Sequence, residues 1–119
     1  MLKSRNIVWG GGTVLAAVLF ALTVSARTPQ VREVTVRADA FAFSPSTIDV
    51  RKDEVVKVTF TAVDMAHSFT IDEYRISKRA AQGQTVTFEF RADKASAPFY
   101  CNLSHDERCK NMRGELRVR

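Results

Sequence analysis

The chain has 119 residues and a formal net charge of +5, with 45% hydrophobic and 26% charged residues. This composition is typical of one globular domain and excludes a disordered, collagen-like or all-membrane protein. Two cysteines are too few for a disulfide-dense mini-protein or a four-cysteine zinc site. The basic residues are scattered and do not alternate with aromatic residues, so we expect no nucleic-acid partner.

The N-terminal segment is predicted to be a targeting or anchoring helix. Residues 7–26 carry no charge and follow Lys3 and Arg5. At a rise of ~1.5 Å per residue they would form ~30 Å of helix, about the thickness of the hydrocarbon core. Residues 24–26 are compatible with signal-peptidase cleavage, but the length of the apolar run favours an uncleaved anchor. We therefore predict an anchor or signal peptide at 1–26 and an extracytoplasmic domain at 27–119.

The rest of the chain is predicted to be all-β. Strands are expected at 31–38, 47–50, 55–62, 68–71, 85–91 and 99–100, with a last strand around 116–118. A bend is expected at 41–45, and one helical turn is an option at 77–81. Short strands at this spacing predict a two-sheet antiparallel Greek-key sandwich. Its core is expected to contain most of the phenylalanines at 41, 43, 60, 69, 88, 90 and 99.

Residues suited to binding copper are concentrated near the C-terminus. The segment 99–112 contains both cysteines, His105 and Met112, and the second histidine of the chain is His67. Thiolate and thioether sulfurs favour Cu(I), whereas imidazole also suits Cu(II). A loop that carries such ligands beside a neighbouring strand would hold copper rigidly at one end of a sandwich and permit fast electron transfer.

At these positions the sequence resembles the cupredoxins, from about residue 41 to residue 118. Residues 64–69 (Asp-Met-Ala-His-Ser-Phe) are similar to the segment around the first copper ligand in oxidase subunit II domains. Residues 99–101 (Phe-Tyr-Cys), His105 and residues 112–118 are similar to the ligand loop and last strand of blue copper proteins. The resemblance implies a cupredoxin-like fold and an electron carrier or electron-entry domain.

The resemblance also implies a ligand set. His67 and His105 would be the imidazole ligands, Cys101 the thiolate and Met112 the weak axial ligand. Cys109 departs from the pattern, because the binuclear purple centre has Cys, Cys, His and Met at offsets 0, 4, 8 and 11. Here those offsets carry Cys101, His105, Cys109 and Met112, so the middle two ligand types are exchanged.

The exchange favours one type 1-like copper, with Cys109 as an additional ligand or without a role in binding. A binuclear centre with permuted ligands is the alternative. A Cys101–Cys109 disulfide is a third possibility, because cysteines eight residues apart outside the cytoplasm commonly pair. Two further residues are expected to support the site. Ser68 would connect the His67 strand to the Cys101 loop and tune the thiolate, and Asp64 would cap the turn that presents His67.

The predicted function is that of an extracytoplasmic, membrane-tethered copper protein that passes single electrons to or from a redox partner such as a cytochrome or an oxidase. We expect no enzymatic activity and no small-molecule substrate, because four protein ligands would leave no open position on the metal. Two alternatives use the same residues. One is a copper chaperone for an oxidase, and the other is a disulfide-stapled binding module without metal.

Overall fold

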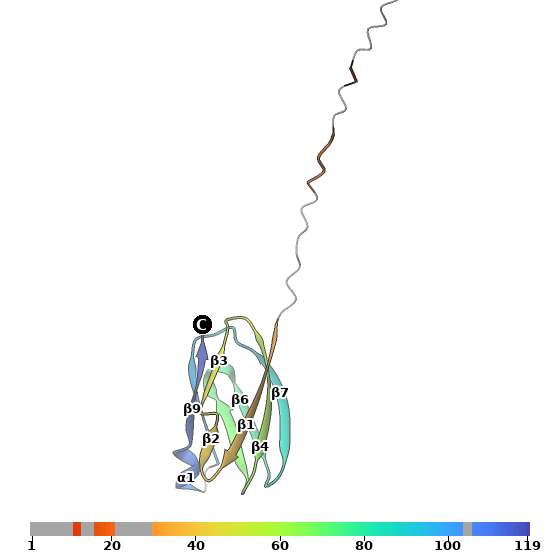
Figure 1. Cartoon of the computed structure of the whole chain (residues 1–119). Coiled ribbons are helices and arrows are strands. Elements are labelled where there is room, and N and C mark those ends of the chain that lie inside the picture. Colours follow the sequence, from red (N-terminus) through yellow and green to blue (C-terminus); the bar gives the residue numbers. More distant parts are fainter. Residues whose placement is uncertain (1–10, 13–15, 21–29, 104–105) are drawn as a thin grey trace, which may run out of the picture.

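The computed structural model describes residues 11–12, 16–20, 30–103 and 106–119. Within those ranges, no helix is long and apolar enough to cross a membrane. Most of the segment predicted to be a hydrophobic helix lies outside the described residues, so the anchor stays a prediction. The described domain is a sandwich of two β-sheets, as predicted (Figure 1).

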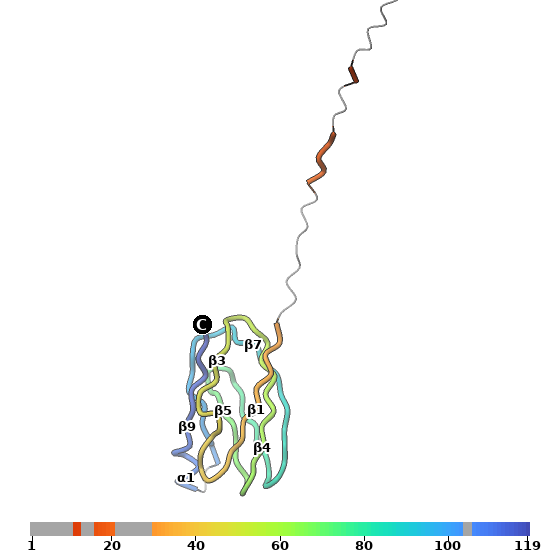
Figure 2. Tube along the Cα trace, in the orientation of Figure 1, coloured from red at the N-terminus to blue at the C-terminus, as the bar shows by residue number. Residues whose placement is uncertain are grey.

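The first sheet has four strands in the order β2-β1-β4-β7. Their bounds are Val31–Asp39 (β1), Ala42–Ser44 (β2), Val55–Ala62 (β4) and Thr85–Arg91 (β7). The second sheet has five strands in the order β3-β9-β8-β5-β6. Their bounds are Thr47–Val50 (β3), His67–Ile71 (β5), Ile76–Ala80 (β6), Ala97–Tyr100 (β8) and Arg113–Val118 (β9). A short 3₁₀ turn, η1, covers Asp72–Tyr74, and helix α1 covers Glu107–Lys110. Figure 2 follows the same path as a tube.

Both sheets are mixed, which corrects the prediction of purely antiparallel sheets. β1 pairs with β4 in parallel, and so does β3 with β9. After the hairpin of β1 and β2 the chain passes to β3 in the other sheet before it returns as β4 beside β1. The alternation of apolar side chains has the same period in both pairings, so the sequence does not encode strand direction.

Two local predictions were wrong. The option of a helical turn at 77–81 is replaced by β6, an edge strand that pairs antiparallel with β5. Its three central residues, Ser77 to Arg79, are exposed, as is common at sheet edges, so no apolar alternation is visible there. The expected bend at 41–45 contains the three-residue strand β2. Helix α1 was not predicted.

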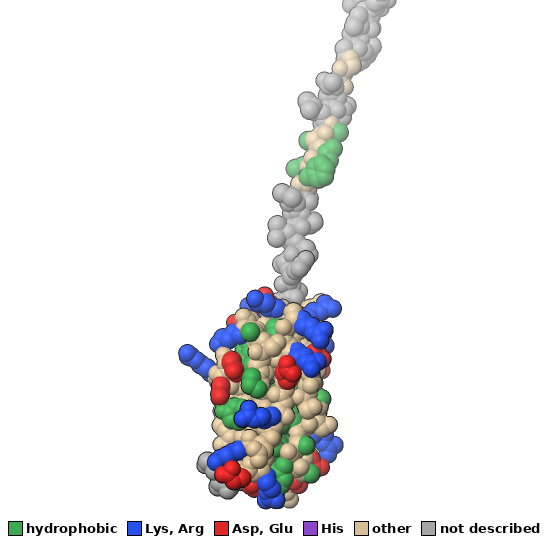
Figure 3. All heavy atoms as spheres, turned by 90° about the vertical axis from the view of Figure 1, so that its left-hand side faces the viewer, with side chains coloured by type: hydrophobic (Ala, Val, Ile, Leu, Met, Phe, Trp, Pro, Cys, Tyr) green, Lys and Arg blue, Asp and Glu red, His purple; other side chains and the backbone are tan. Residues whose placement is uncertain are grey.

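The core between the sheets consists mainly of aromatic rings, as predicted. Five of the seven phenylalanines are buried, at positions 43, 60, 69, 88 and 99, and Phe41 and Phe90 pack against them partly exposed. The rings of Phe69 and Phe99 stack at a centroid distance of 4.8 Å. Gly114 in β9 is required by this packing, because a Cβ there would collide with the Phe99 ring and the Ser46 carbonyl. Lys and Arg are interspersed with Asp and Glu on the face shown in Figure 3.

Candidate metal centre

His67 is the first predicted ligand, and it is held in a fixed orientation at the start of β5. Every residue of this strand is buried, and the His67 side chain is fully enclosed. Its Nε2 lies 2.7 Å from Oδ1 of Asp64. The other ring nitrogen, Nδ1, is buried and has no hydrogen-bond partner among the described residues. When Nε2 donates its hydrogen to the carboxylate, Nδ1 of the neutral ring carries a free lone pair.

Asp64 therefore contacts the imidazole itself, whereas its expected role was to cap the turn that presents His67. Its second oxygen, Oδ2, accepts a hydrogen bond from the backbone N–H of Ala40 at 3.1 Å. The hydrogen bond to His67 is the main cause that holds the pKa of Asp64 below its usual value, with the Ala40 N–H adding to it against the opposing effect of burial. The carboxylate thus stays ionised and acts as an acceptor for both groups.

Cys101 follows β8 directly, and its sulfur is tied to the residue after His67. The Ser68 N–H donates to Cys101 Sγ at 3.4 Å. The Ser68 hydroxyl donates to Oδ1 of Asn102 at 2.6 Å and accepts the Asn102 backbone N–H at 2.7 Å. The strand that presents His67 is therefore joined to the segment that presents Cys101, at the place where Ser68 was expected to act. Asn102 was not singled out in the sequence, where a polar residue in a loop carries no distinctive signal.

Cys109 lies beside Cys101, and the two form a disulfide with a Cα–Cα distance of 5.3 Å. Both cysteines are buried. Helix α1, which carries Cys109, begins after Asp106, whose side chain accepts the Arg108 N–H at 2.9 Å. In this form neither sulfur is a thiolate. The third possibility for the two cysteines is thus the one that the structure displays, and their role as ligands stays a prediction.

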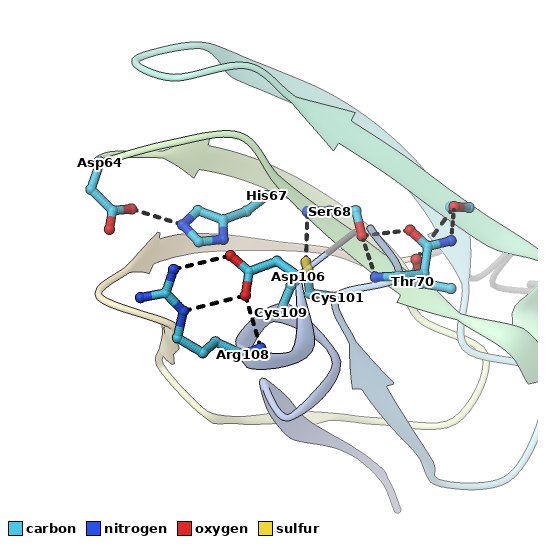
Figure 4. Close-up of a disulfide and its surroundings, with 10 residues drawn as sticks. Asp64, His67, Ser68, Thr70, Cys101, Asp106, Arg108 and Cys109 are labelled. Atoms are coloured by element: carbon cyan, nitrogen blue, oxygen red, sulfur yellow. Dashed lines mark hydrogen bonds and ion pairs between the residues drawn. A yellow bond between two sulfur atoms is a disulfide. The ribbon is translucent and has the colours of Figure 1, made fainter. Parts of the chain in front are cut away.

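Met112 is placed against both cysteines through its backbone. Its N–H donates to the Cys109 carbonyl at 3.0 Å, and its carbonyl accepts the Cys101 N–H at 3.4 Å. The residue is 1% exposed. His67, Cys101 and Cys109 lie close together at the end of the sandwich that carries α1 (Figure 4). The two backbone hydrogen bonds place Met112 beside the cysteines at the same end. His105 lies outside the described residues, which contain no cluster of three His, Cys, Asp or Glu side chains suited to a metal.

Phe41 partly covers His67. Its ring meets the imidazole edge-on at 5.9 Å, and the Arg108 guanidinium lies over its face at 4.2 Å. Ala40 and Phe41 form the two-residue turn between β1 and β2, with φ of 49° and 59°. This left-handed conformation costs a non-glycine residue about 1 to 2 kcal/mol. Because the Ala40 N–H binds Asp64, the turn and the imidazole share one acceptor. From the sequence, Phe41 was expected only in a bend and among the core residues.

The donor set fits a copper ion chemically. A buried imidazole nitrogen with an unused lone pair, a buried methionine and, once the disulfide is reduced, two cysteine thiolates would be ligands that suit copper in either oxidation state. The carboxylate on the far side of the imidazole is also the usual partner of a metal-binding histidine. The described residues form a small β-sandwich with a buried histidine and a cysteine pair at one end.

Comparison with known proteins identifies the family. The family model described as "Cupredoxin-like domain" matches residues 12–116. The chain belongs to this family. A search of curated proteins found no match.

Solved structures share the fold at low sequence identity. Auracyanin A, a blue copper protein from Chloroflexus aurantiacus, aligns with a TM-score of 0.64 and 14% identity, over 75% of this chain and 99% of that one. The periplasmic domain of cytochrome oxidase subunit II from Bradyrhizobium japonicum gives 0.64 and 14%, over 73% and 83%. The metal-binding domain of a Cu(I)-exporting P-type ATPase from Streptococcus pneumoniae gives 0.65 and 14%, over 78% and 90%. At these identities the likeness establishes the fold alone.

Proposed function

We propose that the chain is an extracytoplasmic, membrane-tethered copper protein that exchanges single electrons with a redox partner such as a cytochrome or an oxidase. One type 1-like copper would be held by His67, Cys101, His105 and Met112, with Cys109 as a further candidate ligand. When bound, copper supplies a one-electron couple between its two oxidation states. The observation that carries the proposal is the buried, unpartnered Nδ1 of His67.

The residues of the chain prepare the site in three ways. Asp64 fixes the ring plane of His67 and leaves Nδ1 as the free nitrogen. The Ser68 N–H points at Cys101 Sγ, where it would stabilise negative charge on a thiolate. The two backbone hydrogen bonds of Met112 keep that residue beside both cysteines. A site whose ligands are held in advance needs little rearrangement when the oxidation state changes.

The disulfide implies that copper binding depends on prior reduction. Two electrons and two protons from a reductant convert the Cys101–Cys109 disulfide into two thiols, and loss of the thiol protons gives the thiolates that bind metal. An oxidising compartment, where such a disulfide persists, agrees with the extracytoplasmic location predicted from residues 1–26. The subunit II domain among the structural relatives is likewise periplasmic.

A two-copper centre is the second candidate, and the position of Cys109 favours it. The exchanged order of His105 and Cys109 along the loop argued against two bridging thiolates. The structure nevertheless brings the two sulfurs together, with Cα atoms 5.3 Å apart. Once reduced, both sulfurs could approach the same ion or a pair of ions.

Copper delivery is the third candidate function. It is supported by the structural relative that is a domain of a Cu(I)-exporting ATPase. A delivery protein would use the same sulfurs but would release its metal readily. Electron transfer is preferred here because His67 is fully buried and fixed by Asp64, which is typical of a site that retains its metal.

The test is a copper titration of the reduced full chain under anaerobic conditions, followed by visible and electron paramagnetic resonance spectroscopy. One equivalent of copper, an intense thiolate charge-transfer band and hyperfine splitting from one nucleus support the proposal. Two equivalents with splitting from two equivalent nuclei support the binuclear centre. A colourless Cu(I) complex that loses its metal to a chelator supports delivery. Absence of stoichiometric binding after complete reduction contradicts all three.

Cys101→Ser and Cys109→Ser form a matched pair for this titration. Both variants remove the disulfide and one buried sulfur, so they share any structural cost. A single-copper site held by Cys101 predicts that the band is lost in Cys101→Ser and retained in Cys109→Ser. Loss in both variants shows that both thiolates bind metal.

A further inference from the structure

A pocket opens on the outer face of the five-stranded sheet, beside the candidate metal centre. It has a volume of about 340 Å³ and is lined by Tyr100, Cys101, Asn102, Lys110 and Arg113. Tyr100 of β8 lies opposite Arg113 of β9, so their side chains share one face of the sheet. The neighbouring pair, Phe99 and Gly114, faces the core. The pocket is therefore separated from the core by the strand that ends at Cys101.

Two cationic side chains line this pocket, and neither is strongly neutralised. Arg113 has no ion pair among the described residues, and Lys110 pairs only with Glu107, at 3.4 Å. Both members of that pair are well exposed, at 49% and 88%, so the pair contributes little and exchanges readily. The nearby carboxylate of Asp72 is already engaged, because the Tyr100 hydroxyl donates to its two oxygens at 2.9 Å.

We propose that this pocket binds an acidic side chain of a protein partner, so that an Asp- or Glu-rich segment docks over the outer face of the sheet beside Cys101. The inference rests on the proposed function, for which it supplies the chemistry of the partner. Lys110 and Arg113 would hold the carboxylate, and the Asn102 amide adds hydrogen-bonding capacity. The volume suits one or two side chains.

A protein is favoured over a membrane surface by the position of the pocket. The chain enters the sandwich at Val31, at the end opposite to α1 (Figure 1). If residues 1–26 anchor the protein, the end that carries α1 and the pocket faces away from the lipid. A partner docked there would also lie against the residue whose sulfur is the candidate copper ligand.

The test measures binding of a glutamate-rich decapeptide to the isotope-labelled full chain by nuclear magnetic resonance. The pocket variant is Lys110→Gln with Arg113→Gln. The control, Lys52→Gln with Arg91→Gln, removes the same charge from two exposed residues at the opposite end of the sandwich. We expect shifts centred on the amides of Tyr100, Asn102 and Arg113. Affinity should fall about tenfold in the pocket variant and stay within about twofold of the parent in the control.

Several outcomes would overturn the docking proposal. Equal weakening in both variants means that net charge alone attracts the peptide. Shifts elsewhere place the binding surface on another face. Binding of vesicles that contain phosphatidylglycerol through Lys110 and Arg113, without peptide binding, assigns the pocket to lipid.

The peptide test needs no copper, so its failure is separate from failure of the proposed function. Copper titration of the pocket variant completes the separation. Its stoichiometry and spectrum should match those of the parent, because neither Lys110 nor Arg113 is a proposed ligand. A changed spectrum would show that the substitutions disturb the metal centre, and would contradict a separate docking role.

Discussion

The two ends of the sandwich each contain a buried polar atom without a hydrogen-bond partner in the described part of the chain. These atoms are His67 Nδ1 at the end that carries α1 and Glu54 Oε1 at the other end. The Glu54 carboxylate is 6% exposed, and its second oxygen accepts Arg32 Nε at 2.8 Å. Both atoms are acceptors whose desolvation is not compensated by a hydrogen bond.

The surroundings of these two atoms differ, and the difference distinguishes His67, a candidate ligand, from Glu54, a structural residue. The guanidinium beside Glu54 already balances its negative charge. The other ring nitrogen of His67, Nε2, is hydrogen-bonded to the Asp64 carboxylate, and two cysteine sulfurs lie next to the strand that carries His67. An unpartnered acceptor is therefore insufficient evidence for a metal site. Soft ligands on neighbouring segments supply the missing part.

The largest expected effect is on copper affinity. Substituting the buried residue at each end of the sandwich, His67 or Glu54, compares the two ends directly. His67→Gln should weaken copper binding by the reduced chain more than about 100-fold, the upper range for loss of a residue that merely supports a ligand. Glu54→Gln should leave the affinity unchanged. Competition with a chelator of known affinity measures both. Equal losses in the two variants would show that destabilisation, and not ligation, explains the result.

The next effect concerns the disulfide, which only one of the two ends possesses. A cross-link between cysteines separated by eight residues stabilises a fold by about 2 to 3 kcal/mol. Reduction should lower the free energy of unfolding by that amount, and copper added to the reduced chain should restore stability. Denaturant titrations of the oxidised, reduced and copper-loaded forms measure this. A reduced chain as stable as the oxidised one contradicts the prediction.

The sequence predicted the sandwich well because apolar alternation and turn residues are local signals. Val55–Ala62 and Thr85–Arg91 were predicted with their observed bounds. Parallel pairing of β1 with β4 depends on the path of the chain, which no local signal encodes. Edge strand β6 was missed because its solvated residues Ser77 to Arg79 need no apolar face.

The candidate site was predicted in part. The resemblance to the cupredoxins implied that His67, Cys101 and Met112 lie at one end of the fold, and the structure places them there, whereas their binding of copper stays a prediction. Spacing alone could not decide how Cys109 is used, because eight residues allow a disulfide or a shared ligand equally well. The contact of Asp64 with the imidazole and the role of Asn102 depend on side-chain rotamers and contacts between loops, which a linear pattern does not specify.

A smaller effect is expected from the residue that orients the imidazole. Asp64→Asn should weaken copper binding about 10- to 100-fold, because an amide can donate to Nε2 and thereby move the ring hydrogen to Nδ1. Asp72→Asn is the matched control, since Asp72 also accepts a hydrogen bond from a side chain but lies outside the donor set. Chelator competition distinguishes the two. An unchanged affinity in Asp64→Asn would contradict an orienting role for the carboxylate.

The smallest expected effect is on the pH dependence of the free energy of unfolding, and it concerns Glu54 at the end of the sandwich without the cysteines. The hydrogen bond from Arg32 is the main cause that lowers the pKa of Glu54 relative to its usual value. A carboxyl whose pKa is lower in the folded state stabilises the fold above its unfolded pKa, and this contribution is lost as the pH falls through the folded pKa. Stability of the parent chain should therefore decline as the pH falls below the usual pKa of a glutamate carboxyl, and Glu54→Gln should flatten that decline. Denaturant titrations at pH values above and below that usual pKa give the slopes. Because the pKa of Asp64 is also lowered, some slope should remain in Glu54→Gln and diminish further when Asp64→Asn is added. An equally steep decline in the parent, in Glu54→Gln and in the double variant would contradict the prediction. It would mean that other carboxyl groups determine the pH dependence of stability, and that Glu54 and Asp64 contribute nothing measurable to it.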